Sequence, residues 1–286
     1  MQLITSILIL STGLLTAVSA QNATSDCHDY VIVDTRGTFE KQGPSIGFVG
    51  MINQTLGNIT NGVEYNTVYP AVQNQTYYLG SNDIVRFVDN GLQSCPNQRY
   101  ALLGYSQGAS ATMQALRNYT DTTSAGYKAI AAIVVIGNPY KTPNKTVDVD
   151  QNGGDSTRAT NGSLWRAMVD GVFATGIPEV FYNDGKLLDI CYTGDIVCAP
   201  TPSSNLTQHV QYGLDPKVQN MGAKFLIEKL KAGISSGSTS TNSSTGSGTS
   251  SSGGAAATTG TITGSAAGLY VPAAFLSLAM GMAVML

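Results

Sequence analysis

The stretch that decides the fold is YALLGYSQGASATMQAL, residues 100–116. Its centre, Gly104-Tyr-Ser106-Gln-Gly108, fits the pattern G-x-S-x-G, in which a serine sits at the tip of a sharp strand-to-helix turn. Side chains two residues before and after the serine would collide with neighbouring elements, so both positions need glycine. The residues before the turn are typical of a strand and those after it of a helix. We therefore predict that Ser106 is a nucleophile.

The nucleophile needs a base, because a serine hydroxyl reacts poorly until a neighbouring group takes its proton. The chain has two histidines, His28 before the first predicted strand and His209 after the last. The α/β-hydrolase chain order is serine, then acid, then histidine. Only His209 satisfies this order, and we predict it to be the base.

The acid should lie between Ser106 and His209, just after a late strand. The candidates near that point are Glu179, Asp184, Asp189 and Asp195. We favour Asp195, because it lies within Cys191-Tyr-Thr-Gly-Asp-Ile-Val-Cys198. A disulfide between these cysteines would close a ring of eight residues, worth roughly 2–3 kcal/mol in loop-closure entropy. Such a ring would hold the carboxylate in place to orient the imidazole.

The reaction also needs an oxyanion hole. The backbone N–H of Gln107, at the start of the helix after the serine, is the expected first donor. The second donor should come from the loop after the first strand, residues 34–40, which reads DTRGTFE. There Gly37 would let the backbone approach closely, and Thr38 offers an N–H and a hydroxyl.

Apolar and helical patterns alternate along the middle of the chain. The runs that predict strands are Tyr30–Val33, Tyr100–Gly104, Ala129–Gly137 and Leu187–Tyr192. The predicted helices are Ser45–Leu56, Asn82–Leu92, Gln107–Asn118 and Val218–Leu230. Near-continuous apolar runs fit strands buried on both faces, so we predict an α/β protein, a three-layer α/β/α sandwich with a mostly parallel central sheet. The segment Pro139–Gly162 is polar and predicted to be a long surface loop.

Both ends of the chain resemble targeting signals. Residues 1–20 carry an apolar run and a small-residue cleavage site, which predicts a signal peptide, the alternative being a buried N-terminal helix. Residues 234–268 are almost entirely Ser, Thr, Gly and Ala, which predicts a disordered stalk. Residues 269–286 form an uncharged apolar tail, which predicts a GPI-anchor signal; a retained transmembrane helix is the alternative. The globular domain is then 21–233, long enough for one core.

Composition narrows the possible partners. The net charge is −3 with 15 Lys and Arg and no basic patch, so we expect no nucleic-acid partner. We expect the protein to be a monomer and to contact membranes only through its lipid anchor. Two separated histidines favour neither a metal site nor a cofactor. The four cysteines, in an oxidising compartment, form two disulfides in one of three pairings. Nine glycosylation sequons indicate a glycosylated, secreted surface protein. They lie at Asn22, Asn53, Asn58, Asn74, Asn118, Asn144, Asn161, Asn205 and Asn242.

Taken together, these motifs resemble the cutinase and acetylxylan esterase family. The matching segments are residues 36–40 (RGTFE), 43–46 (GPSI), 104–108 (GYSQG) and 191–198 (CYTGDIVC) followed by His209. The resemblance implies a lidless α/β-hydrolase with Ser106, Asp195 and His209 as catalytic triad and Thr38 and Gln107 as oxyanion hole. It also implies the disulfide pairs Cys27–Cys95 and Cys191–Cys198. Members of the family hydrolyse cutin-like polyesters, short acyl esters or acetyl groups on xylan.

Three departures from the family pattern bear on the substrate. Thr38 stands where many cutinases have serine, Pro139–Gly162 is longer than in compact members, and residues 199–208 (APTPSSNLTQ) are more polar than usual. An apolar rim helps an enzyme sit on a waxy surface, so the polar rim argues against strong lipid-interface binding. We expect a secreted serine esterase acting on cutin-like or short acyl esters. The alternatives are an acetylxylan esterase and a catalytically silent GPI-anchored glycoprotein.

Overall fold

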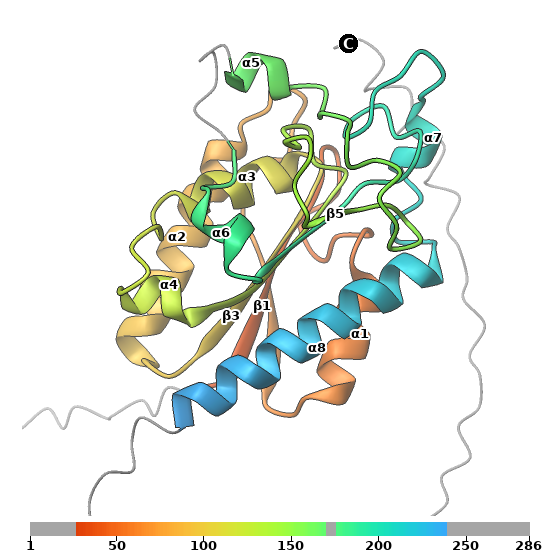
Figure 1. The fold of residues 1–286 in the computed structure, drawn as a ribbon. Helices are drawn as coiled ribbons and strands as arrows, with labels where there is room; N and C mark the ends of the chain where they lie inside the picture. The colour runs from red at the N-terminus through yellow and green to blue at the C-terminus, as the bar shows by residue number, and fades with distance from the viewer. Residues whose placement is uncertain (1–26, 170–175, 239–286) are drawn as a thin grey trace, which may run out of the picture.

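The computed structural model describes residues 27–169 and 176–238, in which one parallel sheet lies between two layers of helices (Figure 1). Across the sheet the strands follow the order β2 (Gly62–Asn66), β1 (Tyr30–Thr35), β3 (Arg99–Tyr105), β4 (Ile130–Ile136), β6 (Leu187–Ile190) and β5 (Asp148–Val149). All neighbouring strands are parallel. The predicted three-layer α/β/α sandwich is confirmed.

The helices divide between the two faces of the sheet. One face is covered by α1 (Val49–Asn58) and α8 (Pro216–Ser238) (Figure 1). The other is covered by α2 (Tyr77–Ser94), α3 (Gln107–Leu116), α4 (Ala125–Ala129) and α6 (Val180–Asn183). The short helices α5 (Trp165–Val169) and α7 (Leu206–His209) lie in connections at the end of the molecule where the strands finish.

The central strands are apolar throughout because successive side chains point to opposite faces and both faces are covered. In β3, Tyr100 and Leu102 pack with the core beneath α2 and α3. Their neighbours Ala101 and Leu103 pack with the core beneath α1 and α8. This arrangement explains the continuous apolar runs in the sequence.

The four predicted strands are present, with ends shifted by a few residues, but the two edge strands were not predicted. Strand β2 carries Gly62 and Glu64 and is only half-buried, so it lacks an apolar signal. Helix α1 begins at Val49 rather than at Ser45. The reason is that the Ser45 amide donates to the Asp34 carboxylate (2.7 Å) and belongs to a loop.

The prediction that Pro139–Gly162 is a surface loop is only partly right, because this irregular segment contains strand β5 and several buried residues. The Lys141 side chain is fully buried, donates to the Thr157 carbonyl (2.8 Å), and lies 3.5 Å from the Asp148 carboxylate. Asp148 begins strand β5 and stands in register with Asp189 of β6. Lys141, Asp148 and Thr157 are therefore buried inside the protein, whereas other polar residues of the segment, such as Asn144 and Asn152, face water.

The buried cluster of Lys141, Asp148 and Asp189 holds two carboxylates beside one ammonium group. Burial, reinforced by the charge of Asp189, raises the pKa of Asp148. Burial also raises the pKa of Asp189, although its carboxylate accepts a hydrogen bond from Asn138 (2.7 Å). Because one lysine cannot neutralise two carboxylates in a medium of low dielectric constant, the cluster favours retention of a proton.

The end of the domain extends further than the sequence suggested. Helix α8 continues to Ser238, so residues 234–238 of the predicted stalk are helical. They continue the helix because Ile234 packs against the core and the Gly233 carbonyl accepts a hydrogen bond from Arg99 (2.9 Å). The rest of the stalk, the predicted signal peptide and the predicted tail at 269–286 lie outside the described residues. Within 27–169 and 176–238, no helix is long and apolar enough to cross a membrane.

Two disulfides connect the cysteines in the pairing that the family resemblance implied. Cys27–Cys95 joins the segments that precede β1 and β3, at the end of the sheet where the strands begin. Cys191–Cys198 directly follows β6, at the opposite end. The two bridges therefore act on opposite ends of the molecule.

Candidate active site

Ser106 occupies the turn between β3 and α3 in strained backbone geometry. Its φ and ψ are 54° and −117°, a conformation that side-chain-bearing residues seldom adopt. The glycines on either side are required by space: a Cβ on Gly104 would lie 2.6 Å from the Gly108 carbonyl oxygen, and one on Gly108 would lie 1.9 Å from the Thr35 carbonyl oxygen. The Ser106 amide donates to the Ile136 carbonyl (3.0 Å), which attaches the turn to β4.

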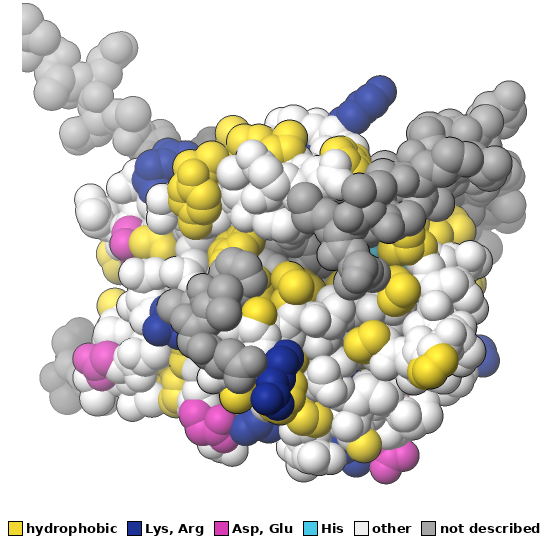
Figure 2. All heavy atoms as spheres, turned by 90° about the horizontal axis from the view of Figure 1, so that it is seen from above, with side chains coloured by type: hydrophobic (Ala, Val, Ile, Leu, Met, Phe, Trp, Pro, Cys, Tyr) yellow, Lys and Arg dark blue, Asp and Glu magenta, His cyan; other side chains and the backbone are white. Residues whose placement is uncertain are grey.

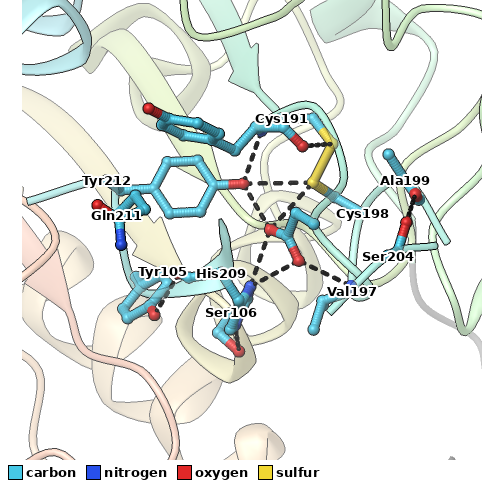
Figure 3. A network of polar contacts seen from close by, with 12 residues as sticks. Tyr105, Ser106, Cys191, Val197, Cys198, Ala199, Ser204, His209, Gln211 and Tyr212 are labelled. Carbon is cyan, nitrogen blue, oxygen red and sulfur yellow. Dashed lines mark hydrogen bonds and ion pairs between the residues drawn. A yellow bond between two sulfur atoms is a disulfide. The ribbon is translucent and has the colours of Figure 1, made fainter. Parts of the chain in front are cut away.

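His209 and Asp195 complete a chain of hydrogen bonds with Ser106 (Figure 3). The His209 Nε2 atom lies 2.9 Å from Ser106 Oγ, and Nδ1 lies 2.9 and 3.0 Å from the two Asp195 oxygens. A carboxylate can only accept, so Nδ1 carries the proton and Nε2 accepts from the serine hydroxyl. The three side chains are 4%, 1% and 0% exposed for Ser106, His209 and Asp195, so the chain of bonds is shielded from bulk water.

The four acidic residues considered from the sequence differ in whether they contact His209. Only Asp195 reaches the imidazole. Glu179 forms an ion pair with Lys145 and Asp184 accepts from the Tyr127 hydroxyl, both away from the histidine. Asp189 is bound by an asparagine in the buried cluster described above.

The loop that holds Asp195 is fixed by more than the disulfide. Its Oδ1 accepts from the Val197 amide (2.7 Å) and its Oδ2 from the Tyr212 hydroxyl (2.6 Å). Its own amide donates to the Tyr192 carbonyl (3.0 Å). Gly194 before it has a φ of +83°, which a side chain would oppose.

The loop after β1 is held beside Ser106 by the side chains of Arg36 and Glu40. The Arg36 guanidinium donates to the main-chain carbonyls of Glu40, Thr67 (3.2 Å) and Tyr69. The Glu40 carboxylate accepts from the Gly37 amide, which directly precedes Thr38. Burial raises the pKa of Glu40, while these hydrogen bonds and Arg36 lower it. The arrangement presets the main chain at Thr38.

Several residues with strained backbone geometry lie on Ser106 and the segments beside it. Apart from glycines, the described residues with positive φ include Phe39 (65°), Ala71 (52°), Gln75 (57°) and Ser106 (54°). The Phe39 amide donates to the Ala71 carbonyl (2.7 Å), and the Gln75 side chain lies 3.5 Å from Thr38 Oγ1. Strained residues persist where surrounding contacts over-determine them, which is common at functional sites.

Gln107 stands at the first position of α3, where a backbone amide has no partner inside the helix. Its side chain donates to the Val72 carbonyl (2.8 Å) and so joins α3 to the loop that contains Ala71 and Gln75. The amides of Thr38 and Gln107 thus belong to two adjoining segments beside Ser106.

Sequence reasoning missed the aromatic residues behind Ser106, His209 and Asp195. The Tyr105 hydroxyl donates to the His209 carbonyl (2.8 Å), and Tyr212 donates to Asp195 (Figure 3). Gly137 leaves room for the imidazole, since a Cβ there would lie 2.6 Å from His209 Cε1. No local signal marks these residues, because each contact joins segments far apart in the chain. His28 lies before β1, at the opposite end of the sheet from Ser106.

Comparison with known proteins identifies the family. The family model of cutinase matches residues 26–230. The chain belongs to the cutinase family. A cutinase-like protein from Cryptococcus sp. is 40% identical, with a TM-score of 0.63, and the match covers 72% of this chain and 97% of that one. The cutinase of Monilinia fructicola is 28% identical over 220 residues, which are 75% of this chain and 90% of that protein.

A third comparison bears on the fold alone. The catalytic core domain of an acetyl xylan esterase from Trichoderma reesei is 19% identical with a TM-score of 0.53, covering 71% of this chain and 99% of that one. As a cutinase-family protein, the chain is a serine ester hydrolase.

In residues 27–169 and 176–238 no group of His, Cys, Asp and Glu is arranged to hold a metal ion.

The two sides of this cutinase-family site differ in polarity. On one side, exposed hydrophobic side chains belong to the segments that adjoin Thr38 and Gln107: Phe39, Val68, Val72, Tyr78 and Leu79. On the other side, the exposed segment before α7 contains Thr201, Pro202 and Ser203. Figure 2 looks onto this end of the molecule and shows hydrophobic side chains in separate patches among polar ones. The segments that adjoin Thr38 and Gln107 therefore carry more exposed apolar side chains than residues 201–203, although Asn74 among them is also exposed.

Proposed function

We propose that Ser106, His209 and Asp195 form the catalytic triad of this esterase. The single observation that carries the proposal is the 2.9 Å contact between His209 Nε2 and Ser106 Oγ, continued by the 2.9 Å contact between Nδ1 and Asp195. In the first step Nε2 takes the hydroxyl proton while Oγ attacks the ester carbonyl carbon. The imidazolium then gives this proton to the leaving alcohol. In the second half, Nε2 takes a proton from water while the water oxygen attacks the acyl carbon. The bond between this carbon and Ser106 Oγ then breaks, the imidazolium returns the proton to Oγ, and the carboxylic acid leaves.

We infer that the backbone amides of Thr38 and Gln107 stabilise the oxyanion formed in both steps. Donors held in place before the reaction stabilise developing charge without reorganisation, which is usually the largest catalytic contribution. The loop of Thr38 is preset by Arg36 and Glu40, and the amide of Gln107 points out of the first turn of α3, where it lacks a helical acceptor.

The substrate we propose is a cutin-like polyester or a short acyl ester. The exposed Phe39, which follows Thr38, and the exposed Val72, whose carbonyl binds Gln107, support an ester with an apolar acyl part, because such side chains otherwise face water. The polar rim near Thr201 favours the second candidate, removal of acetyl groups from wall polysaccharide. A panel that compares release of hydroxy acids from cutin, of acid from short p-nitrophenyl esters, and of acetate from acetylated xylan separates the two.

We further propose a monomeric, glycosylated protein that is secreted and carried on a GPI anchor. Support comes from the sequons within the described residues: the side chains of Asn53, Asn58, Asn74, Asn118, Asn144 and Asn205 are exposed. The expected mature protein begins at Gln21 and is released from cells by a phosphatidylinositol-specific phospholipase. An intact 269–286 peptide in the mature protein would refute the anchor.

The decisive experiment is Ser106→Ala. We expect hydrolysis of a short p-nitrophenyl ester to fall by at least about a thousandfold, because only oxyanion-hole and binding contributions remain. Thermal melting should be nearly unchanged. The matched control is Ser110→Ala, which removes a buried hydroxyl of the same helix that has no hydrogen-bond partner. A fluorophosphonate should label wild type at Ser106. Activity of Ser106→Ala within tenfold of wild type would sink the assignment.

A further inference from the structure

The segment that follows His209 is anchored so that Tyr212 lies behind the site, with 1% of its surface exposed. The Gln219 side-chain Nε2 donates to the Tyr212 carbonyl and to the Gly47 carbonyl, each at 2.8 Å. Gly213 permits this docking, since a Cβ there would lie 1.9 Å from the Ile46 carbonyl oxygen. The position of Tyr212 is therefore set by main-chain contacts with the loop before α1.

The Tyr212 hydroxyl has a donor and an acceptor in fixed directions (Figure 3). It lies 2.6 Å from Asp195 Oδ2, and because a carboxylate only accepts, the hydroxyl must donate there. Its oxygen then accepts from the Tyr192 amide (2.9 Å). Burial, reinforced by the charge of Asp195, raises the pKa of Tyr212 well above 10, so the hydroxyl keeps its proton.

The disulfide closes the remaining side of this hydroxyl. Cys198 Sγ lies 3.3 Å from both the Tyr212 oxygen and Asp195 Oδ2. A disulfide sulfur carries no hydrogen, so these are packing contacts rather than hydrogen bonds. With the sulfur in place the Asp195 carboxylate has strong donors only from Val197, Tyr212 and His209.

The Tyr212 ring also bounds the imidazole. Its plane stands at 87° to that of His209, with ring centroids 6.2 Å apart. The Tyr105 ring lies 5.2 Å from the imidazole on another side, and the Cα of Gly137 closes a third. The histidine therefore has one orientation available inside this enclosure.

We propose that Tyr212 is a positioning residue for ester hydrolysis, whose hydroxyl orients the Asp195 carboxylate and whose ring limits rotation of His209. This inference rests on the proposed function. Without the hydroxyl, Oδ2 loses its shortest hydrogen bond and the carboxylate can turn about its own bond away from Nδ1. An imidazole without that partner no longer holds the tautomer that accepts the serine proton. Because Tyr212 is buried, we expect it not to touch the substrate, so the effect should fall on kcat.

The test is Tyr212→Phe, which removes one oxygen and keeps the ring. We expect kcat per site titrated with an active-site phosphonate to fall about tenfold or more, with KM within twofold of wild type. The low-field proton signal of His209 Nδ1–H in the NMR spectrum should broaden or disappear. Normalising to titrated sites keeps the result valid even if part of the variant does not fold.

The matched control is Tyr192→Phe. The Tyr192 hydroxyl also donates to an aspartate, Asp215 (2.9 Å), rather than to Asp195, and its ring packs edge-on against Tyr212 at 5.8 Å. The main-chain hydrogen bonds of Tyr192 to Asp195 and Tyr212 are not altered by this substitution. This variant should keep kcat and the low-field signal. A full kcat for Tyr212→Phe, or an equal loss in both variants, overturns the inference. Wild-type protein that hydrolyses esters without labelling at Ser106 would instead refute the proposed triad.

Discussion

Replacing Cys191 and Cys198 together with alanine should reduce catalysis more than stability, whereas the same change at Cys27 and Cys95 should do the reverse. The reason lies in where each bridge stands. Asp195 is inside the small ring, and Cys198 Sγ is in contact with its carboxylate. The other bridge lies at the far end of the sheet, before β1 and β3. Alanine is chosen because serine would add a new donor next to Asp195.

The loss of stability follows from loop size. The separation of 7 gives a ring of eight residues, for which the chain-entropy relation yields about 2.5 kcal/mol. The separation of 68 gives a loop of 69 residues and about 4.4 kcal/mol. For a domain of this size each kcal/mol moves Tm by about 2–4 °C, so we expect losses of about 5–10 °C and about 9–18 °C respectively.

The loss of activity follows from the position of the acid. Without the sulfur, Asp195 keeps its hydrogen bonds to Val197 and Tyr212, but the loop around them gains freedom. A triad with a wrongly oriented imidazole loses up to about four orders of magnitude in rate, so even partial misplacement should lower kcat by about tenfold. The variant at Cys27 and Cys95 should keep kcat within twofold.

The assay is kcat per folded molecule, titrated with an active-site phosphonate, alongside thermal melting. Titration separates unfolded protein from misplaced catalytic groups, which a bulk rate would merge. If the small-ring variant keeps full kcat per labelled site, the ring does not position Asp195, and the proposed reason for its place in the sequence is wrong.

Two further predictions concern space and charge. Gly108→Ala should destabilise the protein by about 3 kcal/mol or more, because the new Cβ would lie 1.9 Å from a main-chain carbonyl oxygen of β1. The control Gly57→Ala should instead stabilise it by up to about 1 kcal/mol, because no atom lies within 4 Å of the new Cβ. Urea unfolding measures the free energy of unfolding of both variants. Folding raises the pKa of Asp148 from 3.8 to about 8. Between pH 3.8 and pH 8 the folded state therefore binds a proton that the unfolded state has lost, and the free energy of unfolding falls as pH rises through this range. Asp148→Asn leaves one lysine, Lys141, for one carboxylate, Asp189, and should reduce the fall in Tm between pH 5 and pH 8; an unchanged slope would show that this carboxyl group is not the source.

Much of the site could be predicted from the sequence because its signals are local or depend on chain order. The apolar runs around residue 102 identify a strand buried on both faces, and the two glycines flanking Ser106 identify the turn, since spacing alone sets which side chains would collide. With two histidines in the chain, order along it left only His209 as the predicted base. The family resemblance then supplied the disulfide pairs, which spacing alone had left open.

Only the tertiary structure decided the features that join distant segments. Tyr212 reaches Asp195 and Tyr192, and Arg36 reaches the Tyr69 carbonyl, through contacts that no periodicity records. Likewise, Lys141 looks like a surface residue in a polar segment, yet it is buried because Asp148 adds a strand to the edge of the sheet. Local patterns determine which residues form an element and which chemistry they carry. The partners that hold those residues in place depend on how the elements pack, and this information exists only in three dimensions.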